Sequence, residues 1–143
     1  MRQTGQILGL AVAFGWMGMV LAISFLETPL KFRAPGITIP LGLGIGRIVF
    51  RALNIVEAGL AGVLIVALAT SGAGPARWVL LAVAATVLAL QLTFLRPRLD
   101  SRARQIIAGG QPPRSRLHLV YVALELGKVA ALCWLGILVA ATH

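Results

Sequence analysis

Nine strongly polar or charged residues lie in or beside the apolar segments of this 143-residue chain and cluster toward the same end of those segments. An ionised side chain in an apolar environment costs on the order of several kcal/mol, so such residues either pair with one another or form a binding site. Their carboxylates, cations, amides, phenol and imidazole offer ion pairing, hydrogen bonding and proton exchange. The nine are Arg47, Arg51, Asn54, Glu57, Gln91, His118, Tyr121, Glu125 and Lys128.

The composition indicates an integral membrane protein. Hydrophobic residues make up 59% of the chain and charged residues 12%, and the mean hydropathy is +0.93, well outside the balance of soluble domains. Four apolar runs, at about 6–26, 52–70, 77–95 and 117–141, each approach the roughly 20 residues that a membrane-crossing helix needs. The first run is too long for a signal-peptide core and lacks an A-x-A cleavage site. We therefore expect an all-α polytopic membrane protein in which residues 1–143 form one four-transmembrane-helix bundle.

The positive charges predict how this bundle is oriented. Only Arg2 and Arg77 lie on one side of the expected spans. The first and third connections together carry Lys31, Arg33, Arg96, Arg98, Arg102, Arg104, Arg114 and Arg116. The positive-inside rule therefore predicts a multi-pass protein of the cell (inner) membrane, with cytoplasmic basic connections and both termini outside. This basic rim either binds anionic lipid headgroups or an acidic partner, or serves as a topology signal alone.

Depth and angular position predict that the polar residues of different spans meet. At a rise of about 1.5 Å per residue, Glu57 lies roughly 9 Å and Glu125 roughly 12 Å from the cytoplasmic ends of their helices. Gln91 lies close to the cytoplasmic end of the third span and reaches a similar depth. At about 100° per residue, the polar residues of the second span form one stripe and those of the fourth form another. We expect the two stripes to face each other.

Two interpretations of these stripes remain open. Lys128 can pair with Glu57 and Glu125, or Arg51 can pair with Glu125, and such pairs can fix helix register without binding anything. Alternatively, the stripes line a polar pocket open to the cytoplasm, in which Tyr121 helps to orient a ligand. Three cations against two carboxylates favour an anionic or amphipathic ligand over a bare metal cation.

Catalytic and metal-binding patterns are missing from the sequence. Cys133 is the single cysteine, so we expect no disulfide and no zinc framework. His118 and His143 belong to opposite membrane faces and cannot form a bis-His haem site. We therefore expect no enzymatic activity, no cofactor and no metal.

Glycine and proline mark the first connection and the first span. Residues 42–46 resemble a phosphate-binding loop but lack the Lys-Ser/Thr that follows it. Pro29, Pro35 and Pro40 predict that the first connection consists of short extended or turn pieces lying on the membrane surface. Gly5 and Gly9 have the spacing that permits close helix packing, which we expect within the chain.

The spans also carry recognisable motifs. The first has Gly15, Trp16 and Gly18 before Phe25, Pro29 and Phe32, the second opens with Gly46-Arg47-Ile48-Val49-Phe50-Arg51, the third ends in Leu95-Arg96-Pro97-Arg98-Leu99-Asp100, and the fourth opens with Leu117-His118. This pattern resembles the transmembrane-protein-205-like group of small four-span membrane proteins. It departs from the group where Phe50-Arg51-Ala52-Leu53 replaces a Phe-Pro-x-Tyr-like segment. The group has no well-defined biochemical activity, so the resemblance implies the fold and leaves the function open.

The sequence favours a non-enzymatic binding or accessory subunit, whose polar cluster and basic rim hold a lipid, a small ligand or a partner helix. The alternative is a small oligomeric transporter or an ion- or proton-coupled permease. A transporter needs polar residues or broken helix across the membrane, whereas residues 58–70, 79–90 and 129–141 are apolar or small and uncharged. The expected partners are membrane lipids, anionic headgroups among them, and a membrane protein or further copies of the chain. We expect no nucleic acid partner.

Overall fold

The computed structural model describes residues 2–112 and 116–141, and the regular structure in them is entirely helical. The elements are α1 (Arg2–Val20), η1 (Leu21–Glu27), α2 (Thr28–Lys31), α3 (Ile39–Ser71), α4 (Pro75–Leu90), η2 (Gln91–Leu95), α5 (Arg96–Ile107) and α6 (Leu117–Ala140). The elements η1 and η2 are π-helical. Consecutive elements join into four rods, Arg2–Lys31, Ile39–Ser71, Pro75–Ile107 and Leu117–Ala140, each long and apolar enough to cross a membrane.

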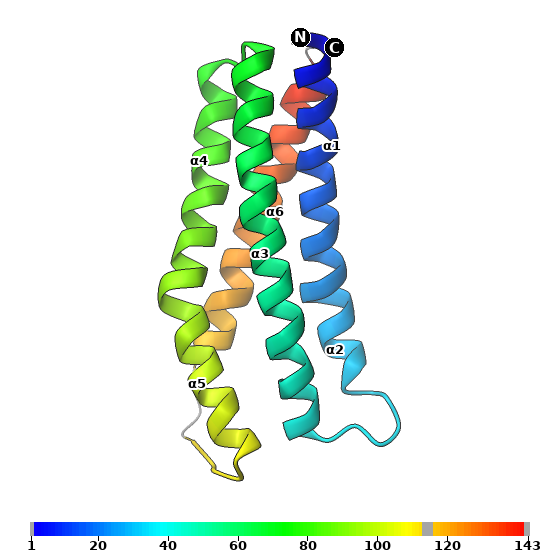
Figure 1. Cartoon of the computed structure of the whole chain (residues 1–143), viewed down its shortest axis with the longest axis vertical. Helices are drawn as coiled ribbons and strands as arrows, with labels where there is room; N and C mark the ends of the chain where they lie inside the picture. Colours follow the sequence, from blue (N-terminus) through cyan, green and yellow to red (C-terminus); the bar gives the residue numbers. More distant parts are fainter. Residues whose placement is uncertain (1, 113–115, 142–143) are drawn as a thin grey trace.

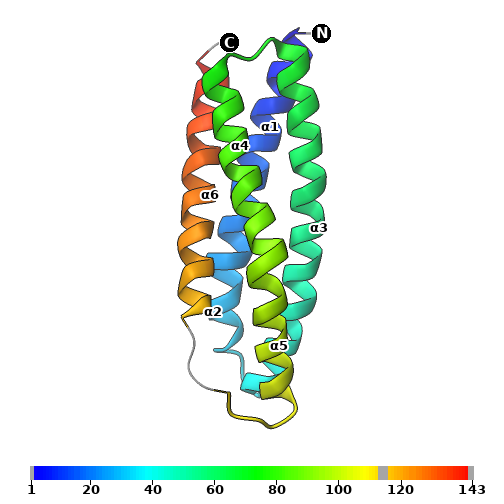
Figure 2. The same ribbon diagram turned by 90° about the vertical axis from the view of Figure 1, so that its left-hand side faces the viewer.

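The four rods run alternately up and down as a bundle. Figure 1 shows both ends of the chain beside the short α3–α4 turn, while α2, α5 and the two longer connections lie at the opposite end. The view turned by 90° gives the same arrangement (Figure 2). α1 packs against α3 and α6, and α4 packs against α6 and α3, whereas α5 packs against α3. We call the two ends the termini end and the basic end, because the expected rim residues that are described lie at the latter.

The second rod begins earlier than its hydropathy predicts. Thr38 caps α3 by accepting a hydrogen bond from the Leu41 backbone N–H at 3.2 Å, and Pro40 lies in the first turn, where proline is tolerated. The expectation of short extended or turn pieces before a second span at about 52–70 is therefore wrong for residues 39–51, which are helical. Gly42 in the first turns of α3 lets the Phe32 ring pack directly against the helix backbone, because the ring occupies the space that a Cβ at residue 42 would need.

The third rod also exceeds its predicted span, because Pro97 lies in the first turn of α5 and does not stop the helix. The second and third rods have 33 residues each. At about 1.5 Å per residue they are about 50 Å long, more than the roughly 30 Å of bilayer hydrocarbon. Their extra turns lie at the basic end.

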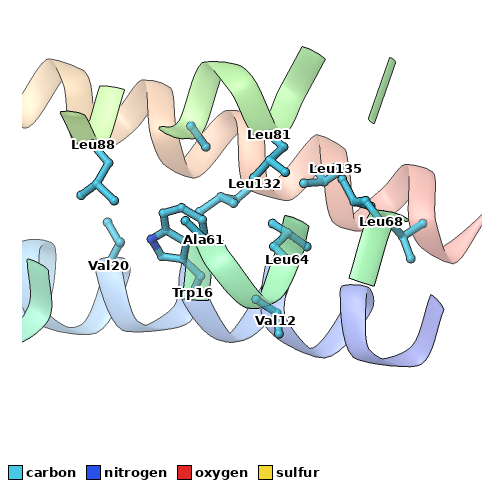
Figure 3. Packing of buried hydrophobic residues seen from close by; sticks show 12 residues of the cluster. Val12, Trp16, Val20, Ala61, Leu64, Leu68, Leu81, Leu88, Leu132 and Leu135 are labelled. Carbon is cyan, nitrogen blue, oxygen red and sulfur yellow. The ribbon is translucent and has the colours of Figure 1, made fainter. Parts of the chain in front are cut away.

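An apolar core fills the bundle toward the termini end. Figure 3 shows Val12, Trp16 and Val20 of α1 with their side chains among those of the other three rods. The other members of this core include Ala61, Leu64, Leu68, Leu81, Leu88, Leu132 and Leu135. Gly5 sets the distance between α1 and α3, because a Cβ there would lie 2.6 Å from Thr70 Oγ1 and 2.9 Å from the Ala67 carbonyl oxygen. This small-residue face therefore packs within the chain, as expected.

Candidate functional site

A cluster of buried polar side chains lies where the four rods meet, on the basic side of the apolar core. Lys128 Nζ lies 2.5 Å from Glu57 Oε1 and 2.7 Å from Glu125 Oε1. Lys128 also donates to Gln91 Oε1 at 2.8 Å, and Gln91 Nε2 donates to Glu125 Oε1 at 2.7 Å. Each of the four side chains is at most 1% exposed. The structure thus brings together these four of the nine sequence-predicted residues.

Two members of this cluster escaped the sequence analysis. Trp16 Nε1 donates to Glu57 Oε1 at 2.9 Å, and Ser24 Oγ donates to Glu125 Oε2 at 2.6 Å. A signal existed for Trp16, because a buried indole N–H needs an acceptor and no other polar residue of its span lies nearby. Ser24 lies eight residues further on, which at about 100° per residue places it roughly 80° away around an ideal α-helix, so the angular rule alone does not pair it with Trp16. We call the six residues Trp16, Ser24, Glu57, Gln91, Glu125 and Lys128 the buried cluster.

The two π-helical stretches coincide with the buried cluster. Ser24 lies within η1, and Gln91 is the first residue of η2. A π-helical stretch changes the direction of the side chains that follow it, and such stretches are common at functional sites. The first and third rods thus depart from α-helical geometry where each contributes a hydrogen bond to Glu125.

The buried cluster satisfies its own hydrogen bonds almost completely. The Lys128 ammonium has three donors and three partners, namely the two carboxylates and the Gln91 carbonyl oxygen. Within the cluster only Glu57 Oε2 lacks a partner. One cation faces two carboxylates here, which corrects the expected excess of cations. The arrangement is therefore that of a closed ion-pair network that joins all four rods.

The arginines of the predicted stripe do not join this network. Arg51 is exposed and does not pair with Glu125, whose partners are Ser24, Gln91 and Lys128. Arg47 Nε lies 3.9 Å from Asp100 Oδ1. Arg96 Nη1 lies 3.7 Å from the same oxygen. These distances exceed hydrogen-bonding range, so both ion pairs are loose.

A lateral groove of about 1180 Å³ opens between α3 and the η2–α5 part of the third rod. Its floor is apolar and includes Leu41, Ile45, Ile48, Ile55 and Leu92. Arg47, Arg51, Arg96 and Asp100 also line the lateral groove. Asn54 lies there too, only 4% exposed, and neither its Nδ2 nor its Oδ1 has a hydrogen-bond partner in residues 2–112 and 116–141.

A smaller pocket of about 270 Å³ lies among α2, α3, α5 and α6, and we call it the inner vestibule. Tyr121 and His118 line it, together with Lys31 and Arg102. His118 is exposed, whereas Tyr121 is buried. Arg47, Arg96 and Asp100 line both the groove and the vestibule, and therefore form a partition between them.

The remaining residues of the expected rim lie at the basic end. Arg33, Arg98, Arg104 and Arg116 are exposed, whereas Arg114 lies outside the described residues. Lys31 is paired with Glu27 at 3.9 Å. Within the described part of the chain, no group of three His, Cys, Asp or Glu side chains could hold a metal ion.

No family model, no curated protein and no solved structure matches the chain. We therefore infer function from the geometry of the buried cluster, the lateral groove and the inner vestibule. Of these, only the groove and the vestibule combine accessible space with polar groups that lack partners.

Proposed function

We propose that the chain is a non-enzymatic integral membrane protein that binds an anionic, lipid-like amphiphile in the lateral groove. Asn54 is the observation that carries this proposal. A buried carboxamide without partners costs about 1–3 kcal/mol, and native structures rarely leave one unmet. A ligand that hydrogen-bonds to Asn54 from the lateral groove would remove this cost.

The groove has the charge and polarity that an anionic amphiphile requires. Arg47, Arg51 and Arg96 face it with Asp100 as the single carboxylate, so its polar rim attracts anions. Guanidinium groups bind phosphate and carboxylate oxygens in pairs. The isoleucine and leucine side chains of the floor suit an acyl or similar chain. A partner helix or a second copy of the chain would need an acidic group at this height to match the same rim.

The orientation proposed from the sequence agrees with this use. If the basic end is cytoplasmic, the arginines of the groove lie near the headgroup level and its floor lies at the edge of the hydrocarbon. The first and third connections lie at one end of the bundle and the two termini at the other. This arrangement supports the proposed topology, with both termini outside.

The termini end supports a binding protein over a transporter. Apart from Ser71, the buried side chains between the buried cluster and that end are apolar among the described residues. The Ser71 hydroxyl donates to the Leu68 carbonyl oxygen of its own helix. A solute path through one copy would need polar groups or broken helix in this region.

The proposal is tested by lipid capture in nanodiscs. The full-length protein is reconstituted in phosphatidylcholine discs containing a small fraction of phosphatidic acid, and retained lipid is measured by native mass spectrometry. We expect selective retention of phosphatidic acid, which Asn54→Leu and Arg51→Gln each weaken by about tenfold. Arg98→Gln is the matched control, because Arg98 is exposed on α5 outside the groove. If Arg51→Gln and Arg98→Gln reduced the retention of phosphatidic acid equally, the retention would depend on the general positive charge of the rim, and the proposal would be overturned.

The topology is tested by cysteine accessibility in intact cells. With Cys133 replaced by Ser, single cysteines are placed at Ser101 on α5 and at Gly74 in the α3–α4 turn. We expect an impermeant maleimide to label the Gly74 position and to leave the Ser101 position unlabelled until the cells are opened. Labelling of Ser101 from outside would reverse the orientation and place the groove rim at the outer membrane face.

A further inference from the structure

The inner vestibule differs from the lateral groove in size and in surroundings. Its volume of about 270 Å³ is below the roughly 300–1,000 Å³ of pockets for drug-sized ligands. Helices border it on several sides, and α2, α3, α5 and α6 all contribute lining residues. These dimensions suit a compact ligand without a long apolar chain.

Tyr121 presents an unmet donor in this pocket. The side chain is 4% exposed, and its hydroxyl has no acceptor among the described residues. The neighbouring Arg96 guanidinium can donate to this hydroxyl but cannot accept from it. Buried tyrosine hydroxyls normally find a partner. A phenol can donate to an anionic oxygen at short range, so the vestibule offers an oxyanion one neutral donor.

Arg96 supplies a fixed cation beside this hydroxyl. Its Cζ lies 4.9 Å from the ring centroids of both Phe50 and Tyr121, and these two rings meet edge to face at 5.9 Å. Packing against two rings holds the guanidinium in place. Its Nε lacks a partner, and its ion pair with Asp100 is 3.7 Å long. Hydrogen-bonding capacity therefore remains for a ligand.

The charges around the pocket favour an anion. Lys31, Arg47, Arg96 and Arg102 line it, with Asp100 as the single carboxylate of the lining. Glu27, which does not line the pocket, is paired with Lys31. The carboxylates of Glu57 and Glu125 in the buried cluster are paired with Lys128. The exposed imidazole of His118 also lines this pocket.

We infer that the inner vestibule is a second binding site, specific for a compact phosphate-type oxyanion held by Tyr121 and Arg96. This inference goes beyond the proposed function, because the site lies on the other side of the Arg47–Arg96–Asp100 partition and needs no acyl chain. The same phosphate chemistry can arrive as the free ion or as a lipid headgroup. The experiment below separates these sources.

The test is titration calorimetry of inorganic phosphate into the full-length protein in a neutral detergent and chloride buffer. We expect saturable binding at one site per chain. Tyr121→Phe keeps the ring that packs on Arg96 but removes the hydroxyl, and should weaken phosphate binding by about tenfold. Arg96→Lys keeps the charge but loses the paired donors, and should weaken binding as well.

Two controls separate this site from the lateral groove. Asn54→Leu should leave phosphate binding unchanged while it reduces capture of phosphatidic acid in nanodiscs. Arg98→Gln, an exposed change outside the vestibule, should alter neither. If phosphate binds only as phosphatidic acid, and that binding requires the Tyr121 hydroxyl, the vestibule is a headgroup site and the inference holds with a lipid source.

The inference fails if Tyr121→Phe weakens neither the binding of inorganic phosphate nor the capture of phosphatidic acid. It also fails if Arg98→Gln weakens phosphate binding as much as Arg96→Lys does, because the affinity would then depend on overall charge and not on the vestibule. Neither result touches the groove proposal, which is judged by how Asn54→Leu, Arg51→Gln and Arg98→Gln change the capture of phosphatidic acid. A thermal unfolding curve for Tyr121→Phe checks that the variant folds, and we expect it to resemble that of the wild-type protein, because the ring that packs against Arg96 is kept.

Discussion

The buried cluster and the pockets of the basic end contain the same kinds of polar side chain, but they differ in how far the protein itself satisfies the hydrogen bonds of these side chains. In the cluster, Lys128 uses all three donors on protein acceptors, and Glu125 has three protein donors. At the basic end, neither amide atom of Asn54 has a hydrogen-bond partner among the described residues, and the Tyr121 hydroxyl, beside the Arg96 guanidinium, has no acceptor there. Polar groups that the protein satisfies stabilise its fold, whereas buried groups that it leaves unmet are available to a ligand.

The two regions also differ in charge and in position along the bundle. The cluster has one cation for two carboxylates, while Arg47 and Arg96 share the single carboxylate of Asp100. The cluster lies where all four rods contribute. The lateral groove starts at the level of the cluster, where Ala58 and Leu92 line it, and continues into the turns that the second and third rods add beyond the length a bilayer requires. Structural ion pairing therefore occupies the centre of the bundle, whereas the proposed binding sites extend from there to the basic end.

Loss of Lys128 should have the largest effect on stability. Lys128→Met removes the one cation of the cluster and leaves two buried carboxylates without it, a change that costs about 3–5 kcal/mol. The measurement is the free energy of unfolding in mixed micelles titrated with dodecyl sulfate. Leu126→Ala, on the same helix but 54% exposed, serves as the control and should change it far less. A Lys128→Met protein as stable as the control would show that the cluster does not hold the rods together.

Substitution of Glu125 should separate hydrogen bonding from charge. Glu125→Gln keeps an oxygen that can accept from Ser24 or Lys128, so we expect a loss of about 1–2 kcal/mol. Glu125→Leu removes every acceptor and leaves three donors unmet, so we expect about 3 kcal/mol or more. The same denaturation assay compares the two variants. Equal losses would mean that the negative charge alone matters.

Trp16 should contribute less than the ionised residues. Trp16→Phe removes the indole N–H that donates to Glu57 and leaves a gap in the apolar core, at a cost of about 1–3 kcal/mol. Trp134→Phe is the matched control, because Trp134 is 62% exposed and lies on α6; its effect should be about 0.5 kcal/mol or less. A similar loss in both variants would argue against a role for the Trp16–Glu57 hydrogen bond.

The helical fold and much of the cluster follow from simple sequence rules. Hydropathy locates all four rods, because long apolar runs with few charges have few alternatives to helix. Depth alone predicts that Glu57, Gln91 and Glu125 meet, because rise per residue is nearly constant along a helix. The start of α3 was also readable, since Thr38 and Pro40 form a standard N-terminal pattern that hydropathy had obscured.

Facing directions were harder to predict. The 100° rule gives relative angles within one helix, but it does not fix how that helix is rotated against its neighbours, so Arg51 was assigned to the interior and is exposed. The π-helical stretches add a second error, because they shift the angular register at Ser24 and Gln91. The lateral groove and the inner vestibule depend on contacts between distant segments, such as Arg47 with Asp100, which no local pattern encodes.

The last prediction compares two buried amides, one from each region, and concerns the smallest effect on stability. Gln91→Leu removes a side chain that both donates to Glu125 and accepts from Lys128, and should cost about 1–3 kcal/mol. Asn54→Leu removes a side chain without partners, so in ligand-free detergent the free energy of unfolding should stay unchanged or rise by about 1 kcal/mol. Phosphatidic acid should stabilise the wild-type protein and not Asn54→Leu, because a ligand stabilises only the state that binds it. If Asn54→Leu destabilises the ligand-free protein as much as Gln91→Leu does, then Asn54 is a structural residue like Gln91, and the distinction between the closed cluster and the open groove fails.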